Sequence, residues 1–467
     1  MLTYYNSKAS RLRYAAPYTL TGVGGAALAL LGLLLLLIAW TVSLVPDNYF
    51  ISAAALHNIT CDLCGMGCGL VFLSCLLFLA AFIIYKKTPD AERIRHMVYR
   101  GLCCPAYGNP LHLKDGEFLP RVSCVPSNSG RYDITVTGAS VAMEDIAKSA
   151  SRISSLINGK FQRYAVVYVD AAPDYNCVKF CIEDVVQDFS LTFKSAGEMR
   201  NYDRTKLLIQ NGTAIDLTSS GSMLVAGKTR SGKTTGVIGL LLQVLQHGRD
   251  EYGSEIMIID PKQAELSRLP HTVTLDDDGE ARGILEALRR FAETIKARQQ
   301  ILNDQSEQCG DAIHWWQAGM HPSFLFLDEY VACRSLFPKR PEKDFPDYCL
   351  TEFDGLIKRI VTMGASAGCF VIISIAQASV DEGGLPSMLR SAMSTKILFR
   401  PTLEEGRLMW PGPDLEVLAI ARRYVPGDAW FSSTDGAHDA PSYVHFPHLD
   451  FPAYAELGRL LREYYGN

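Results

Sequence analysis

Two long apolar stretches near the start of the chain stand out in the pattern of hydrophobic and polar positions. The first runs from Tyr14 to Pro46 and the second from Leu63 to Tyr85, and neither contains a charged residue. About 20 apolar residues suffice to cross a bilayer as a helix. A secretory signal would have a shorter apolar region and a cleavage site. We therefore expect residues 14–87 to form a two-helix transmembrane hairpin rather than a signal or two buried core helices.

The charges that flank these stretches predict their orientation. Lys8, Arg11 and Arg13 precede the first stretch and a run of basic residues begins at Lys86, whereas residues 47–62 contain no Lys or Arg. Positive residues concentrate on the cytoplasmic side of membrane helices. Residues 1–13 are expected to form a basic cytoplasmic tail, with both termini in the cytoplasm.

The pattern is weaker between the hairpin and residue 217. Residues 88–130 show no sustained periodic pattern of apolar and polar residues, and we interpret them as a juxtamembrane connector. Alternating stretches at Asp133–Val136 and Tyr164–Val169 flank a helical pattern at Val141–Ile157, which predicts a small α/β domain over residues 131–217. Because this segment has no catalytic combination of residues, we expect a structural or assembly role.

Short apolar runs alternate with longer amphipathic ones from Ser222 onward. This order is typical of a mostly parallel, helix-covered sheet, and we expect residues 218–467 to form an α/β motor domain of the P-loop NTPase type. The predicted strands are Met223–Ala226, Ile256–Asp260, Phe324–Asp328, Phe370–Ile375 and Lys396–Phe399, and the predicted helices are Lys233–Gln246, Glu280–Leu302 and Leu350–Met363.

The first of these strands leads into a glycine-rich loop. Its residues match the P-loop pattern, namely Gly227, Lys228, Thr229, Arg230, Ser231, Gly232, Lys233, Thr234 and Thr235. The backbone N–H groups of such a loop, together with the helix N-terminus behind it, bind phosphate. We expect the ligand to be ATP, with Lys233 at its β- and γ-phosphates and Thr234 on Mg²⁺.

Two further strand ends carry candidate catalytic residues. Asp328 ends an apolar run about a hundred residues after the P-loop, where it can bind Mg²⁺, and Glu329 beside it can polarise the attacking water. Gln377 follows the next strand and could hydrogen-bond the γ-phosphate as a sensor of hydrolysis. The alternative for Gln377 is an exposed amide that only caps its strand.

Composition narrows the remaining choices. The formal net charge of −5 gives no overall basic surface, so nucleic-acid binding has to be argued from local residues. The 13 cysteines are scattered rather than dense as in a disulfide scaffold. Cys61, Cys64 and Cys68 share one helical face, but because no histidine stands at zinc-finger spacing from them we expect packing rather than a metal site.

A fourth strand end brings in a family resemblance. Asp260-Pro261-Lys262 is followed by Glu265-Leu266 and Leu269-Pro270-His271. With the P-loop, Asp328-Glu329 and Gln377, this order resembles the motor domain of FtsK/SpoIIIE-type DNA translocases over about residues 201–433. The layout of the N-terminal half is similar to that of TcpA-like coupling proteins of conjugative elements.

This resemblance implies a ring, expected to be a hexamer, anchored in a bacterial plasma membrane and threading double-stranded DNA with ATP bound between subunits. The family's DNA-contacting loops correspond to the segments after Glu329 and after Gln377. The first segment contains the DNA-contact candidates Arg334, Lys339, Arg340 and Lys343. The second is less basic than the family pattern, since Ala378 stands where the family has an arginine.

A second departure concerns the arginine that the family donates to a neighbouring subunit. The family places it three residues before the glycine that opens the Gln377 strand, and counting back from Gly368 gives Ala365. Such an arginine can be worth about 10³–10⁵ in rate. Either hydrolysis is slow or another cation serves, for which the candidates are Arg359, Arg400 and Arg407.

The functional expectation is a DNA-pumping ATPase that acts as a coupling protein in conjugation, with relaxase components as partners. An appended sequence-reading domain is not evident after the motor, which favours conjugation over chromosome segregation. The alternatives are a chromosome or plasmid segregation translocase, an ATPase of a protein secretion system, and a nucleotide-binding assembly subunit that hydrolyses little.

Overall fold

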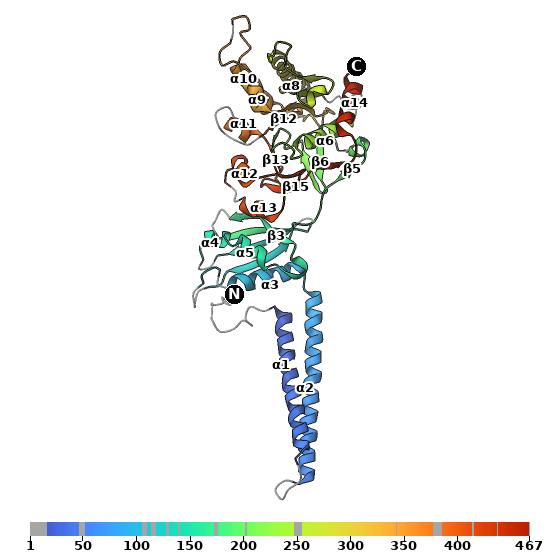
Figure 1. The fold of residues 1–467 in the computed structure, drawn as a ribbon, viewed down its shortest axis with the longest axis vertical. Helices are drawn as coiled ribbons and strands as arrows, with labels where there is room; N and C mark the ends of the chain where they lie inside the picture. Colours follow the sequence, from blue (N-terminus) through green and yellow to red (C-terminus); the bar gives the residue numbers. More distant parts are fainter. Residues whose placement is uncertain are drawn as a thin grey trace. The chain divides into compact units, whose positions relative to one another are not determined.

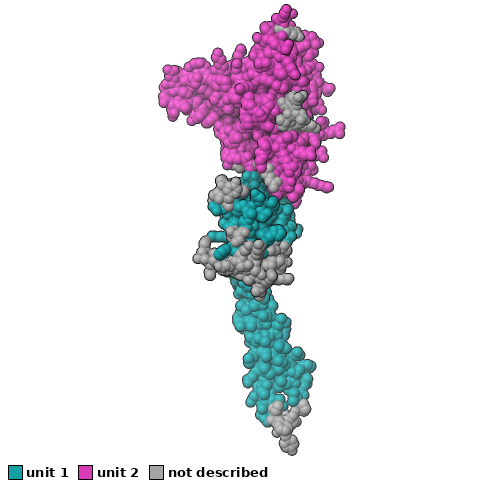
Figure 2. All heavy atoms as spheres, turned by 90° about the vertical axis from the view of Figure 1, so that its left-hand side faces the viewer, with its two compact units in different colours: residues 1–185 teal, residues 186–467 magenta. Residues whose placement is uncertain are grey.

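The structure is a computed structural model of the chain. It describes residues 16–45, 52–104, 110–113, 118–127, 130–138, 141–171, 176–200, 203–246, 255–341, 343–376, 385–412, 415–436 and 438–466. Contacts divide the chain into two compact units, residues 1–185 and residues 186–467, which Figure 2 draws in teal and magenta.

Two long helices begin the first unit. Helix α1 spans Pro17–Ser43 and α2 spans Ala53–Lys87, and the two lie side by side as a hairpin (Figure 1). Both are long and apolar enough to cross a membrane, and most of their large apolar side chains are exposed. Such surface needs an apolar surrounding, which agrees with the membrane anchor predicted from the sequence.

Glycines allow the two helices to approach closely. A Cβ atom placed on Gly32 would lie 2.9 Å from the carbonyl oxygen of Gly67, and one placed on Gly67 would lie 2.8 Å from Cγ of Leu36. Small residues at such crossings let helix backbones come into van der Waals contact.

The rest of the first unit is built on an antiparallel sheet. Its order is β1-β2-β4-β3, with β1 at Arg121–Pro126, β2 at Tyr132–Thr137, β3 at Tyr164–Ala171 and β4 at Cys177–Asp184. Alternate residues such as Ile134, Val136, Phe180 and Ile182 are buried. The single helix predicted at 141–157 is instead two short helices, α4 at Met143–Ala147 and α5 at Ala150–Leu156.

Residues 88–130, interpreted from the sequence as a juxtamembrane connector with no sustained period, contain regular structure. Helix α3 spans Asp90–Cys103, and its residues Ile94, Val98 and Leu102 are fully buried. Their spacing of four places them on one helical face, which packs toward β1 and α5. The surrounding charges, among them an Arg95–Glu92 ion pair, concealed this short apolar stripe in the sequence.

The second unit contains the motor sheet. Among the described residues its order is β10-β9-β11-β12-β8-β13-β14-β15, parallel from β10 to β13 and antiparallel beyond. The strands are β8 Met223–Ala226, β9 Ile256–Ile259, β10 Thr272–Val273, β11 Ser323–Leu327, β12 Cys369–Ile375, β13 Thr395–Phe399, β14 Asp428–Ser433 and β15 Ser442–His445.

Helices cover this sheet, as Figure 1 shows for α6, α8 and α14. They are α6 Lys233–Leu245, α8 Arg282–Cys309, α9 Tyr330–Ser335, α10 Leu350–Met363, α11 Ser387–Ala392, α12 Leu403–Met409, α13 Glu416–Ala421 and α14 Ala453–Tyr465. Every residue of β8, β9, β11 and β12 is buried, as expected for parallel strands covered on both faces. The predicted α/β fold of the P-loop type is therefore confirmed.

The boundary between the units differs from the predicted one at residue 217. Strands β5 at Thr192–Phe193, β6 at Lys206–Gln210 and β7 at Thr213–Asp216 belong to the second unit, where β5 pairs with β16 at His448–Leu449. The side chain of Gln243 on α6 accepts from the N–H of Leu208 at 2.7 Å and donates to its C=O at 2.9 Å. Apolar residues of β6 and β7 also share the core of α6.

We predict that Gly32→Leu separates α1 from α2, because overpacking a close contact typically costs about 1–3 kcal/mol. The readout is oxidative cross-linking between cysteines introduced at Gly25 and Leu77, since a Cβ atom placed on Gly25 would lie 3.4 Å from Cβ of Leu77. The hairpin's native cysteines are first replaced by serine, and cross-linking should slow several-fold.

Gly22→Leu is the matched control, since nothing lies within 4 Å of a Cβ atom at that position. An equal loss of cross-linking in both variants would contradict the role assigned to the glycine contact.

Candidate nucleotide-binding site

The carboxyl ends of four neighbouring parallel strands meet at one edge of the motor sheet. Leu327 of β11 is level with Ile259 of β9 and Ile373 of β12, and Ile375 of β12 is level with Ala226 of β8. The residues that follow these strands therefore emerge together, as ligand-binding loops do in open α/β sheets.

The loop after β8 folds as the sequence predicts. Gly227 has φ 156° and Gly232 has φ 96°, and α6 begins directly afterwards at Lys233. A Cβ atom placed on Gly227 would lie 2.9 Å from Cβ of Phe399. A Cβ atom placed on Gly232 would lie 2.7 Å from the backbone nitrogen of Gly427. Only glycine allows the backbone to pass at these two points.

Neighbouring groups hold this loop in place. The N–H of Gly427 donates to the carbonyl oxygen of Ser231 at 3.0 Å. The hydroxyl oxygen of Ser231 is buried and has no hydrogen-bond partner among the described residues. A buried polar atom without a partner at an anion-binding loop fits a site that completes its hydrogen bonds with a phosphate ligand.

The side chain of Lys233 lies next to Glu329, one of the two acidic residues that follow β11 at this edge. Its Nζ lies 3.5 Å from a carboxylate oxygen of Glu329 and donates to the carbonyl oxygen of Ile375 at 3.3 Å. The other carboxylate oxygen of Glu329 lies 3.5 Å from Nζ of Lys262. Glu329 has φ 49°, a left-handed backbone that costs free energy for a residue with a side chain. The P-loop lysine and the predicted water-polarising acid are thus brought together.

Asp328 occupies the same edge, beside Glu329. Burial is the main cause that raises the pKa of its carboxyl, with Glu329 and Asp260 adding to the effect and Ser374 and Lys233 opposing it. Thr234 lies in the first turn of α6. Carboxylate and hydroxyl oxygens are the ligands that Mg²⁺ prefers, so the donor chemistry of Asp328 and Thr234 fits that ion.

Asp260 is a site residue whose role the sequence did not reveal. It is fully buried, and its carboxylate accepts hydrogen bonds from the backbone N–H groups of Lys262, Ala264 and Ser267 at 2.9 to 3.1 Å. These bonds fix the turn after β9 and so hold Lys262 near Glu329. A buried carboxylate without a basic partner is stable here because backbone donors surround it.

A cavity of about 500 Å³ opens beside the start of α6. Thr234, Thr235, Glu265, Arg268 and Tyr454 contribute to its lining. Its size lies in the range of pockets for small ligands and cofactors. The sequence did not reveal this cavity, because its walls come from segments roughly 180 to 220 residues apart.

The predicted sensor Gln377 lies outside the described residues. Strand β12 ends at Ile375, so its carboxyl end emerges between those of β8 and β11. The sensor role of Gln377 remains a prediction.

The predicted DNA-contact residues divide into two groups. Arg334 on α9 forms two hydrogen bonds with the carboxylate of Asp354 on α10, at 2.9 and 2.8 Å, which raise the pKa of the arginine and balance its charge. Lys339, Arg340 and Lys343 are exposed and form no ion pair with another described residue. The unbalanced positive charge of the segment is therefore on these three residues.

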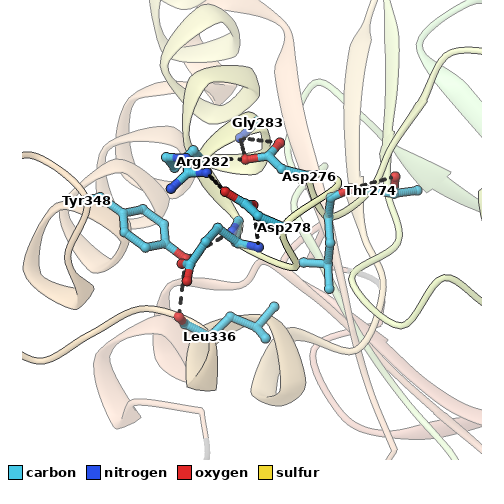
Figure 3. A network of polar contacts seen from close by, with 10 residues as sticks. Thr274, Asp276, Asp278, Arg282, Gly283, Leu336 and Tyr348 are labelled. Carbon is cyan, nitrogen blue, oxygen red and sulfur yellow. Dashed lines mark hydrogen bonds and ion pairs between the residues drawn. The ribbon is translucent and has the colours of Figure 1, made fainter. Parts of the chain in front are cut away.

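This basic segment is attached through a polar network at its C-terminal end (Figure 3). The hydroxyl of Tyr348 accepts from the N–H of Ala281 at 2.9 Å and donates to the carbonyl oxygen of Leu336 at 3.4 Å. Arg282 pairs with Asp276 and Asp278 in the same network. The root of the segment is thus tied to the start of α8, while its basic side chains are exposed.

The candidates for the missing arginine occupy different places. Ala365 lies in a 3₁₀ turn before β12. Arg359 is exposed on α10, Arg407 on α12 pairs with Glu416 at 3.0 Å, and Arg400 follows β13.

Comparison with known proteins gives a family match within the second unit. Residues 196–318 match the model of the FtsK/SpoIIIE family. The Ftsk domain-containing protein YdcQ of Bacillus subtilis is 28% identical over 152 residues, which are 32% of this chain and 28% of that protein. The DNA translocase FtsK of Bacillus anthracis is 24% identical over 276 residues, covering 52% of this chain and 33% of that protein. The chain thus spans about a third of these relatives.

Solved structures give weaker likenesses. The monomer form of the pCW3 conjugation coupling protein TcpA with ATPgS is 12% identical, with a TM-score of 0.47 over 74% of this chain and 93% of that one. ATPases 2 and 3 of EssC from Geobacillus thermodenitrificans are 17% identical, with a TM-score of 0.41 over 60% of this chain and 52% of that one.

We predict that Asp328→Asn stabilises the nucleotide-free and Mg²⁺-free protein at neutral pH, raising its unfolding temperature by a few degrees. The reason is that burial penalises the ionised carboxylate and raises its pKa in the folded state. Above that raised pKa the native state carries the penalty, and below the unfolded-state pKa of about 3.9 the carboxyl is neutral in both states. The advantage of the variant should therefore shrink as the pH falls.

Thermal unfolding of both proteins between pH 4 and pH 8 is the measurement. A variant that is less stable than the parent at neutral pH, or a difference that grows toward acid, would refute this account of Asp328.

Proposed function

We propose that this chain, whose residues 196–318 belong to the FtsK/SpoIIIE family of ATPases, is a membrane-anchored DNA translocase that serves as the coupling protein of a conjugative transfer apparatus. The observation that carries the proposal is the convergence of Lys233, Asp328 and Glu329 at one sheet edge, followed along the chain by a segment with exposed basic residues. This combination supplies an ATP site and a phosphate-binding surface within one domain.

Each residue of the ATP site has a role in this proposal. The P-loop from Gly227 to Thr235 binds the phosphates, and Lys233 neutralises the charge that develops on them. Thr234 and Asp328 bind Mg²⁺, Glu329 orients and polarises water, and Gln377 senses the γ-phosphate. Lys262, held near Glu329 by the turn that Asp260 fixes, tunes the charge of that acid.

The DNA-binding part of the proposal rests on charge and on relatives. Three exposed cations, Lys339, Arg340 and Lys343, are suited to bind the phosphate groups of DNA without recognising its base sequence. Arg334 contributes through its ion pair with Asp354, which holds α9 against α10. The curated relatives named above and others include DNA translocases, which supports double-stranded DNA as the cargo.

The remaining elements define where the motor works. The α1–α2 hairpin anchors it in a bacterial plasma membrane, with both termini and the motor in the cytoplasm, where ATP is available. The active form in this proposal is a ring of identical subunits, a hexamer, that receives DNA from relaxase components. A segregation translocase would use the same chemistry on another cargo route.

A second candidate function is an ATPase of a protein secretion system. The formal net charge of −5 favours this candidate, because DNA-binding domains usually carry a net positive charge.

We predict that long duplex DNA stimulates the steady-state ATPase activity of the detergent-solubilised protein. Stimulation should exceed about tenfold at low salt and fall steeply as salt rises, because phosphate contacts release counterions. Lys233→Ala should abolish hydrolysis with or without DNA. Activity that duplex DNA does not change would move the proposal to the secretion ATPase.

We predict that replacing Lys339, Arg340 and Lys343 together by alanine weakens DNA stimulation and flattens its salt dependence, while ATPase activity without DNA stays within about twofold of the parent. The matched control replaces Lys148, Arg152 and Lys160 in the first unit, which removes the same charge elsewhere. If both triple variants lose stimulation equally, the segment is not the DNA contact.

A further inference from the structure

Strand β13 brings an arginine to the edge where ATP is proposed to bind. It runs parallel to β8, with Leu398 level with Ala226. The P-loop follows β8 and Arg400 follows β13, so both emerge at the same edge of the sheet, on adjacent strands. The sequence did not reveal this, because the pairing of β13 with β8 joins segments about 170 residues apart.

Two hydrogen bonds fix the backbone of Arg400 relative to the P-loop. The N–H of Arg400 donates to the carbonyl oxygen of Asp428 at 2.8 Å, and the residue before Asp428, Gly427, donates to Ser231 of the P-loop at 3.0 Å. The residue before the arginine, Phe399, touches the loop directly, since its carbonyl oxygen lies 3.1 Å from a Cβ atom placed on Gly227. The backbone of Arg400 is therefore held directly beside two residues, Phe399 and Asp428, that adjoin or contact the phosphate-binding loop.

The backbone of Arg400 is strained. Its φ is 47°, in the left-handed region, although it carries a long side chain and precedes Pro401. Arg230 in the P-loop and Glu329 at the acidic strand end are strained in the same sense at the same edge. Such conformations cost free energy, persist where the surrounding structure fixes them, and cluster at ligand sites.

The side chain of Arg400 is exposed, and within the described part of the chain no carboxylate pairs with it. By contrast, Arg407 is already paired with Glu416. Arginine is suited to phosphate because its planar group donates two parallel hydrogen bonds. An exposed arginine beside an anion-binding loop can complete the set of cations around a triphosphate.

The family position at Ala365 lies at the other end of the sheet. The turn that contains it precedes β12, whose carboxyl end emerges beside the P-loop. A strand of this length spans roughly 20 Å. A residue at 365 is thus remote from the P-loop of its own subunit, whereas residue 400 follows the strand next to β8 at the P-loop edge.

We propose that Arg400 contacts the phosphates of ATP bound to the same subunit and supplies in cis the cation that position 365 does not provide. This inference rests on the proposed ATP site. In this arrangement, Arg400 binds the terminal phosphate and stabilises the negative charge that develops on it during transfer to water. Water attacks the terminal phosphorus and ADP leaves, as in ordinary ATP hydrolysis.

The first test measures nucleotide binding, so that it does not depend on turnover. Arg400→Asn is chosen because asparagine tolerates the left-handed backbone. It should weaken the affinity for ATPγS by about tenfold or more and leave the affinity for ADP within about threefold. Arg400→Lys should recover part of the loss. Arg459→Asn on α14, an exposed surface charge, is the control and should change neither affinity.

Equal affinities of parent and Arg400→Asn for ATPγS would overturn the inference. Unchanged ATPγS affinity together with absent ATPase activity in the parent would instead count against the proposed function as well, so the two failures are distinguishable. Where both proteins bind ADP alike, a folding defect is excluded as the cause of weaker ATPγS binding.

The second test separates action in cis from action in trans. Arg400→Asn alone should lower kcat at least about 100-fold. Subunits carrying Arg400→Asn are then mixed with subunits carrying Lys233→Ala. If Arg400 acts in cis, each site in the mixture lacks either its lysine or its arginine, and activity stays at the level of the separate variants.

If Arg400 acted across a subunit interface, a Lys233→Ala neighbour would donate its intact arginine to an Arg400→Asn site. About a quarter of the parent activity would then return in an equal, randomly mixed ring. That recovery would overturn the assignment in cis.

Discussion

The two glycines of the P-loop are the constraint on which the rest of the site depends. Gly227 passes against Phe399 and Gly232 against Gly427, at distances that exclude any side chain. Because these neighbours belong to β13 and to the turn before β14, the loop has its shape only when those strands are paired beside it. Close packing therefore connects the shape of the P-loop to the pairing of β13 with β14, and the position of Arg400 follows from the same contacts.

Much of the motor fold could be predicted from the sequence, and the reason is burial. Strands such as Met223–Ala226 are enclosed on both faces, so they appear as uninterrupted apolar runs between turn residues. The first unit was harder. Helix α3 buries only a narrow stripe, and β4 has polar residues such as Lys179 and Asp184 that form ion pairs with neighbouring elements. Its antiparallel order depends on pairings that no local period encodes.

The parts of the candidate site that could be predicted are those whose residues lie close together in the sequence. The P-loop and the Asp328-Glu329 pair are short motifs, and Lys233 does lie next to Glu329. The sequence could not show that Asp260 fixes a turn, that Arg334 is paired with Asp354, or that Arg400 reaches this edge. Each of these depends on contacts between segments far apart in sequence or on a left-handed backbone, which residue type alone does not specify.

The bond between Gly427 and Ser231 has a consequence for how the protein is made. The two residues are almost 200 positions apart, so closing the loop between them costs conformational entropy and requires that both segments have been made. Synthesis proceeds from the N-terminus, so α1 and α2 are complete before the turn at residue 427 is made. The P-loop can therefore take its final shape only after residue 427 has been made, when the α1–α2 hairpin is already complete.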